Sequence, residues 1–163
     1  IQRLVTLLNM KTGPYNFDIR VDKNDNVFFI EMGARNGGNL IPHITKYATG
    51  VDLIEYTIKA AVGEDCTDLR MVEPKGYWSC YTISSQKNGI FKGIEMDSEF
   101  ERNNVVEYEL FAKPGDSIFA FTGSDKKLGS LVLKYSSMEE MIEKMNNMTN
   151  WVKVILEDSL VEK

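Results

Sequence analysis

Two short stretches of alternating apolar residues, separated by a tight polar turn, constrain the fold of this chain more than any other feature. Residues 17–21 and 28–32 each carry an apolar side chain at every second position. This period of two is typical of a strand with one buried face. The segment between them, residues 23–26, has the composition of a turn. We therefore predict a β-hairpin whose apolar face is half-buried, with residues 28, 30 and 32 of the second strand facing the core.

The register of this hairpin decides what its polar face can do. If the turn centres on residues 24 and 25 and the ladder is regular, Asp18 lies opposite Glu31. Directly opposed Cβ atoms are about 5 Å apart, a distance at which two carboxylates repel each other unless a cation lies between them. If the turn centres one residue later, Arg20 lies opposite Glu31 and forms an ordinary cross-strand ion pair. The first register favours a metal site, and the second favours a solvated face.

An arginine and a pair of glycines follow the second strand. Arg35 comes four residues after Glu31, and Gly37 and Gly38 precede an apolar-periodic stretch that begins at Leu40. Glycine lets backbone N–H groups approach an anion, a helix N-terminus adds a positive dipole end, and arginine offers a two-pronged hydrogen-bond donor. Carboxylates beside such a cradle suggest a metal that bridges to phosphate oxygens. A glycine pair alone more often serves chain reversal.

The segment 17–64 resembles a known enzyme family. It contains FDIRV, FFIEMGARNGGN and YATGVDLIEYTIKAAVGED, and is similar to the C-terminal part of the ATP-grasp domain of carboxylate–amine ligases, biotin carboxylases and carbamoyl-phosphate synthases. The resemblance implies that Asp18 and Glu31 hold Mg²⁺, with Mn²⁺ as an alternative cation, and so bind ATP. It also implies that Arg35 contacts the transferred phosphoryl group. The backbone N–H groups of Gly37 and Gly38 would then be offered to the substrate.

One position departs from the family pattern. The family commonly has an asparagine, a further metal ligand, two residues after the second carboxylate, and Gly33 stands there in this chain. Some purine-pathway members also have a small residue at this position. We expect Asn36 or Asn39 to supply the missing oxygen, with Asn36 as the predicted ligand, although either would equally serve as a cap for the following helix.

The resemblance implies an ATP-dependent ligase that forms an amide-type bond through an acyl-phosphate. Its substrates would be ATP, a small carboxylate and an amine, and the sequence identifies neither the acid nor the amine. Two alternatives stay open: a bicarbonate-using enzyme of the carbamoyl-phosphate synthase or biotin carboxylase type, and an inactive ATP-grasp-like binding module. Helical spacing begins at Ile1 without a cap. Family members carry an N-terminal domain and a lid before this point, so we expect an inactive fragment that holds only the magnesium and phosphate end of the site.

Composition agrees with part of a cytoplasmic enzyme. The 163 residues are 43% hydrophobic, which is enough for one or two small cores. The net charge of −5 argues against a nucleic-acid partner, and no apolar run reaches membrane-spanning length. Cys66 and Cys80 have no metal-binding or redox spacing, so we expect free thiols in a reducing compartment. A homodimer is compatible with all of these features.

Two helices and then a strand-rich region follow the hairpin. Helical spacing predicts helices over residues 40–47 and 51–62, and a boundary divides the chain into residues 1–72 and 73–163. Beyond it, turn signals separate strand candidates over residues 77–84, 89–96, 105–112, 117–121, 128–135 and 151–156. One helix is expected after residues 136–140, which have capping-box spacing. The expected fold is α+β: the C-terminal part of an ATP-grasp fold, with an antiparallel sheet and flanking helices, plus an antiparallel β-rich subdomain with one helix.

Overall fold

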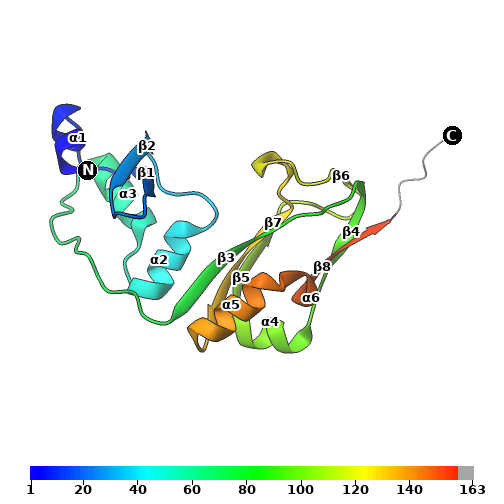
Figure 1. Ribbon diagram of the computed structural model, residues 1–163. Coiled ribbons are helices and arrows are strands. Elements are labelled where there is room, and N and C mark those ends of the chain that lie inside the picture. The colour runs from blue at the N-terminus through cyan, green and yellow to red at the C-terminus, as the bar shows by residue number, and fades with distance from the viewer. Residues whose placement is uncertain (158–163) are drawn as a thin grey trace. The chain divides into compact units, whose positions relative to one another are not determined.

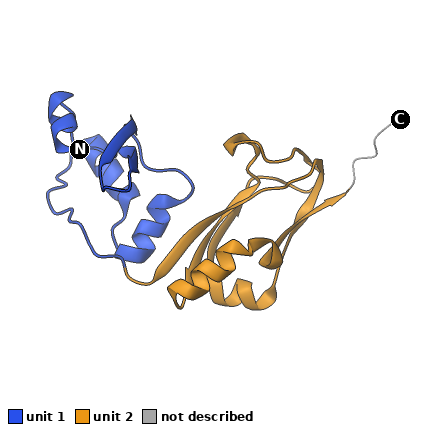
Figure 2. Cartoon of the chain, in the orientation of Figure 1, with its two compact units in different colours: residues 1–74 blue, residues 75–163 orange. Residues whose placement is uncertain are grey.

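The chain folds into two compact units, residues 1–74 (unit 1) and residues 75–163 (unit 2), as Figure 2 shows. The structure is a computed structural model and describes residues 1–157. Both units combine helices with antiparallel strands (Figure 1), so the expected α+β class is confirmed. No helix in the described part is long and apolar enough to cross a lipid bilayer.

Unit 1 consists of a short helix, a β-hairpin and a pair of helices. Its elements are α1 (Gln2–Leu7), β1 (Asn16–Val21), β2 (Val27–Gly33), α2 (Ile41–Thr49) and α3 (Leu53–Val62). The two predicted helices are confirmed. The side chain of Asp52 caps α3 by accepting hydrogen bonds from the backbone N–H groups of Ile54 and Glu55. The helix ends at Gly63, whose φ of 78° lies in the left-handed region that favours glycine.

The hairpin contains a bulge that the sequence did not predict. Near the turn, Arg20 lies opposite Phe28, whereas farther from the turn Asp18 lies opposite Glu31. Between these pairs β2 has one residue more than β1, and the extra residue is Ile30. The predicted pairing of the two carboxylates is therefore confirmed. The regular ladder is wrong, and so is the alternative register in which Arg20 pairs with Glu31.

The bulge also changes which side chains share a face of the hairpin. Phe29 lies opposite Ile19 and so on the face of Phe17, whose ring it meets edge-on with centroids 5.9 Å apart. The expected core face of residues 28, 30 and 32 is wrong because the bulge shifts the alternation. The half-buried hairpin is wrong as well, since Phe28 is 56% and Ile30 58% exposed. A two-stranded sheet needs a third strand or a helix packed against it to bury one of its faces.

Unit 1 has almost no core of its own. Among its residues, all of which the structure describes, only Pro42 and Ala48 are buried. The apolar residues Ile1, Leu7 and Leu8 at and beside α1 are also exposed. The core that composition predicts therefore lies in unit 2.

Unit 2 contains two antiparallel sheets with helices between their strands. Its elements are β3 (Tyr77–Ile83), β4 (Gly89–Met96), α4 (Ser98–Asn104), β5 (Val105–Leu110), β6 (Ser117–Ile118), the 3₁₀ turn η1 (Ser124–Lys126), β7 (Gly129–Tyr135), α5 (Met138–Asn146), α6 (Met148–Trp151) and β8 (Val152–Glu157). The strand orders are β3-β7-β5 and β6-β4-β8. Every predicted strand is confirmed, although β6 is shorter than expected.

The prediction of one helix in this part of the chain is wrong. The predicted helix is α5, and α4 and α6 accompany it. At the start of α4, the Asp97 carboxylate accepts hydrogen bonds from the backbone N–H groups of Glu99 and Phe100. An aspartate before two acidic residues is a helix-start signal that the sequence contained. The short α4 lacks a repeating apolar stripe, because Phe100 is its only buried apolar residue.

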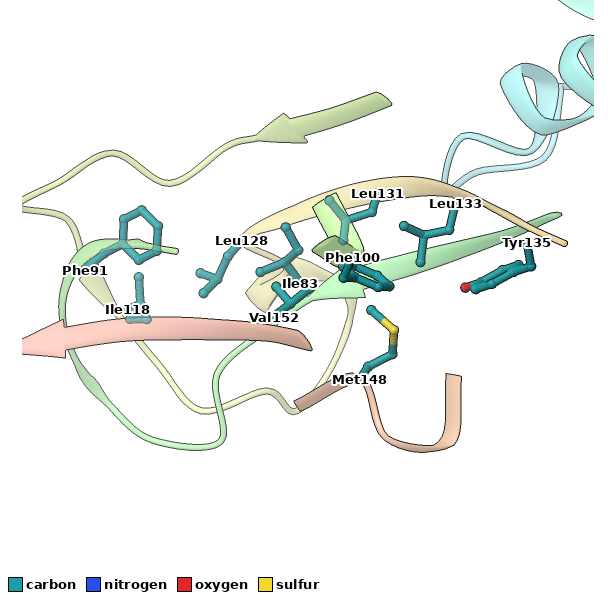
Figure 3. Packing of buried hydrophobic residues seen from close by; sticks show 10 residues of the cluster. All are labelled: Ile83, Phe91, Phe100, Ile118, Leu128, Leu131, Leu133, Tyr135, Met148 and Val152. Carbon is teal, nitrogen blue, oxygen red and sulfur yellow. The ribbon is translucent and has the colours of Figure 1, made fainter. Parts of the chain in front are cut away.

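The core of unit 2 forms around β7, the central strand of its sheet (Figure 3). Leu131, Val132 and Leu133 are fully buried, with 0% exposure. Side chains from both sheets and from the helices join in one cluster: Ile83, Phe91, Phe100, Ile118, Leu128, Leu131, Leu133, Tyr135, Met148 and Val152. Each large apolar side chain buried in this way contributes about 1.5–3 kcal/mol to stability.

A polar network joins α4, β7 and α5 beside this core. Asn104, which is 2% exposed, donates hydrogen bonds to the Lys134 carbonyl at 2.9 Å and to Glu140 Oε1 at 3.0 Å. Lys144 Nζ lies 2.7 Å from Asn104 Oδ1 and 2.9 Å from Glu140 Oε1. The Ser136 hydroxyl and N–H also donate to Glu140. These Ser136 donors, followed by Asn104 and Lys144, lower the pKa of Glu140 to about 2.

Candidate functional site

Asp18 and Glu31 lie side by side on one face of the hairpin, on the far side of the bulge from the turn. Directly opposed residues of antiparallel strands share a face, and both carboxylates are exposed. Neither carboxylate forms an ion pair within residues 1–157. Two hard oxygen donors on neighbouring strands match the preference of Mg²⁺ and Mn²⁺ for carboxylate ligands. The donor set therefore fits the cation that the resemblance implies.

Asn16 and Gly33 form the next cross-strand pair on this face. Asn16 Nδ2 lies 3.5 Å from Asp18 Oδ1. Asn16 Oδ1 lies 3.2 Å from the position that a Cβ on Gly37 would occupy. Sequence reasoning missed Asn16, although its place two residues before Asp18 in a strand puts it on the same face.

The side chain of Arg35 lies beside Gly33. A Cβ on Gly33 would lie 3.4 Å from Cγ and 3.5 Å from Nε of Arg35. Arg35 Nη1 donates a hydrogen bond to the carbonyl oxygen of Asn36 at 2.8 Å. The other guanidinium N–H groups have no hydrogen-bond partner among residues 1–157, and the side chain is exposed. The N–H groups of this guanidinium that stay free are able to bind an anion through two parallel hydrogen bonds.

In the turn before α2, Asn39 and Leu40 have left-handed backbone conformations, with φ values of 53° and 60°. The Ile41 N–H closes the turn on the Gly38 carbonyl at 3.2 Å. Gly38 is therefore the first residue of this turn, but neither glycine occupies its left-handed positions. Gly37 serves close packing, because a Cβ there would lie 3.0 Å from Ile41 Cδ1, whereas no heavy atom lies within 4 Å of a Cβ on Gly38. Left-handed residues other than glycine cost about 1–2 kcal/mol each and cluster at functional sites.

Asn36 is directed toward α3. Its Nδ2 donates to Thr57 Oγ1 at 2.8 Å. Together with Tyr15 and Tyr56, these two residues line a cavity of about 220 Å³ in unit 1. Asn36 does not cap α2, which begins after Leu40 without a side-chain cap. The role of Asn36 as a metal ligand stays a prediction.

The described residues contain no group of three or more His, Cys, Asp or Glu side chains placed to bind a metal. A third protein ligand beside Asp18 and Glu31 would therefore be an amide, hydroxyl or backbone oxygen. Both cysteines are free, as predicted, and burial raises the pKa of Cys80.

No protein-family model matches the chain. It is similar to a protein of Sinorhizobium fredii described as uncharacterized protein y4rH, with 25% identity over 155 residues. The match covers 93% of this chain and 32% of that protein. The chain thus spans about a third of the length of this relative.

Solved structures of similar fold are longer enzymes. The L-amino acid ligase from Bacillus licheniformis is 24% identical with a TM-score of 0.79, covering 94% of this chain and 38% of that chain. Phosphoribosylglycinamide synthetase from Anaerococcus prevotii is 21% identical with a TM-score of 0.76, covering 96% and 40%. N5-carboxyaminoimidazole ribonucleotide synthetase from Thermotoga maritima is 16% identical with a TM-score of 0.71, covering 95% and 40%. The chain therefore has the fold of the C-terminal part of ATP-grasp enzymes.

Proposed function

We propose that this chain is the C-terminal part of an ATP-dependent carboxylate–amine ligase that forms an amide-type bond through an acyl-phosphate. The observation that carries the proposal is the pairing of Asp18 with Glu31, next to Gly33, beside which the partly free guanidinium of Arg35 lies. Two carboxylates that form no ion pair among residues 1–157 suit a divalent cation, and guanidinium N–H groups that stay free there suit a phosphate or carboxylate. The similarity to an L-amino acid ligase supports an amino acid as one substrate.

Each residue of the site has a distinct task in this proposal. Asp18 and Glu31 hold Mg²⁺, which neutralises charge on the phosphates of ATP when it is bound. Arg35 binds the transferred phosphoryl group through its two-pronged donor. The backbone N–H groups of Gly37 and Gly38 have no acceptor among residues 1–157 and are offered to the substrate.

The reaction has two steps. A carboxylate oxygen of the acid attacks the γ-phosphorus of ATP, so that a new P–O bond forms while the bond to ADP breaks. The amine nitrogen then attacks the acyl carbon, phosphate leaves, and the nitrogen loses a proton. Arg35 and the glycine N–H groups stabilise the negative oxygens that develop in both steps.

The rest of the enzyme would lie outside this chain. The chain spans about two-fifths of the ligase and synthetase structures that it matches. Contacts to adenine and to the acid and amine would then come mainly from the remainder, and we expect the isolated chain to be inactive. The exposed apolar hairpin supports this proposal, because such a surface is ordinarily covered by further structure.

An oxygen-transfer experiment on the full-length protein tests the chemistry. Amino acids labelled with ¹⁸O in the carboxyl group are incubated with ATP, Mg²⁺ and a panel of amines, and the released phosphate is analysed by mass spectrometry. An acyl-phosphate route transfers one labelled oxygen to phosphate for each amide formed. Amide formation with unlabelled phosphate would refute that route. ATP binding without turnover would favour an inactive module, and a requirement for bicarbonate would favour a carboxylase-like enzyme.

A further inference from the structure

The neighbours of Asp18 and Glu31 on the hairpin are unequal in size. Gly33, which follows Glu31 by two residues, has no side chain to direct toward the carboxylates. The residue directly opposite Gly33 is Asn16, whose carboxamide lies between Asp18 and Gly37. An amide oxygen on β1 is thus available at the place where β2 offers none.

We propose that Asn16 provides the third protein oxygen for the cation held by Asp18 and Glu31. This inference rests on the proposed function, because it takes the two carboxylates as ligands. It goes further, because it assigns the role of third metal ligand to Asn16 of β1, whereas the family pattern has this ligand on β2, at the position of Gly33.

The spacing of the donor groups supports this assignment. Adjacent ligands of an octahedral Mg²⁺ at about 2.1 Å lie roughly 3 Å apart. The Asn16 carboxamide lies 3.5 Å from Asp18 Oδ1, close to that separation. Rotation of the amide by half a turn exchanges its nitrogen and oxygen, and this terminal torsion has broad, roughly two-fold preferences. The oxygen would then lie on the side of Asp18 and the nitrogen on the side of Gly37.

Other groups are less well placed to provide this oxygen. Asn36 is held by its hydrogen bond to Thr57 of α3. The described residues provide no cluster of three titratable ligands, so a third donor must be of another type. Asn16 is half-buried at the beginning of a strand, which limits the side-chain freedom lost on binding.

Titration of the full-length protein with Mn²⁺ tests the assignment, because free Mn²⁺ is counted by electron paramagnetic resonance without reference to activity. We expect Asn16→Ala to weaken Mn²⁺ binding about tenfold or more, since even indirect partners of a metal site are worth that much. Asn16→Asp should retain binding, because it keeps an oxygen at the same place. Asn24→Ala, in the turn of the same hairpin, is the matched control and should bind as the wild type does.

A rescue variant separates ligation from folding. If Asn16 replaces a side chain missing from β2, Gly33→Asn should restore Mn²⁺ binding to Asn16→Ala. A Cβ on Gly33 meets only the flexible side chain of Arg35 at 3.4 Å or more, so the substitution fits. If neither the double variant Asn16→Ala/Gly33→Asn nor the single variant Asn16→Asp binds Mn²⁺, the role of Asn16 is structural and the inference is overturned.

Variants of the carboxylates distinguish this inference from the proposed function. If Asp18→Asn and Glu31→Gln lose Mn²⁺ while Asn16→Ala binds as tightly as the wild type, Asn16 is no ligand and the proposed function stands. If both carboxylate variants keep full Mn²⁺ affinity, the proposed cation site itself is refuted. If Asp18→Asn, Glu31→Gln and Asn16→Ala all lose Mn²⁺ binding, and Gly33→Asn restores it to Asn16→Ala, both the proposed function and this inference are supported.

Discussion

Replacing Glu140 by glutamine should destabilise unit 2 by an amount that depends on pH. The Glu140 carboxylate accepts hydrogen bonds from Ser136, Asn104 and Lys144, which lower its pKa from 4.5 to about 2. A glutamine has one acceptor oxygen, and its amide N–H groups would point at donors. The network that joins α4, β7 and α5 would therefore lose both charge and hydrogen bonds.

The magnitude follows from the lowered pKa of Glu140. A change from 4.5 to about 2 corresponds to about 3 kcal/mol of preference for the folded state. The side chain is 24% exposed, so solvent screening reduces the expected loss to about 2 kcal/mol. Because the folded state has the lower pKa, this stabilisation is complete above pH 4.5 and disappears as the pH falls toward 2.

Tryptophan fluorescence during urea unfolding measures this loss selectively. Trp78 and Trp151 are the two tryptophans of the chain, and both lie in unit 2. Trp151 stacks on Phe100 with ring centroids 5.8 Å apart, beside Lys144. We expect the free-energy difference between the wild type and Glu140→Gln to shrink by more than half between pH 5 and pH 3.

Glu139→Gln is the matched control, because it removes the same charge from the same first turn of α5. Glu139 is exposed and lies outside the network, so its replacement should destabilise unit 2 much less than that of Glu140. A pH-independent loss in Glu140→Gln would assign the effect to packing. Equal losses in the two variants would assign it to the helix dipole, and either result would refute the reasoning.

Other changes test the site in unit 1. Asp18→Ala and Glu31→Ala should each abolish magnesium-dependent ATP binding by the full-length protein in calorimetry, and unchanged affinity in both would mean that the hairpin face is only solvated. Arg35→Lys should lower turnover far more than nucleotide affinity, because an ammonium cannot bond bidentately, whereas equal losses would place the contact in the ground state. Gly37→Ala should cost about 1 kcal/mol in chemical unfolding, because its Cβ would lie 3.0 Å from an isoleucine methyl. Gly38→Ala meets no atom within 4 Å and is the control, so equal losses would contradict the packing argument.

Local patterns in the sequence predicted most elements of the fold. Alternating apolar residues marked the strands, and Asp52 and Gly63 marked the ends of α3. The bulge at Ile30 was not predictable from the same pattern, because four consecutive apolar residues, 27–30, fit either register. Compared with the predicted register, the turn moves the pairing by one residue, and the bulge moves it back by one. The two changes cancel, so Asp18 still lies opposite Glu31.

Features that depend on side-chain contacts over long distances in the sequence could not be predicted. Asn104 meets Glu140 and Lys144, which are 36 and 40 residues away. Nothing in the neighbourhood of any one of these residues indicates the other two. Asn16 was missed for a related reason, because an asparagine next to a proline-containing segment is more typical of a turn. Its contact with Gly37 depends on how the loop after β2 returns to β1.

The division of apolar surface between the units bears on how the site is held. Unit 2 buries a cluster of apolar residues around β7, whereas the hairpin of unit 1 exposes Phe28 and Ile30. A two-stranded sheet is marginal in water, and opposed carboxylates weaken it further. A cation between Asp18 and Glu31 reverses the sign of that interaction, so cation binding and hairpin stability support each other. The same residues would then bind the ligand and order the strands that present it.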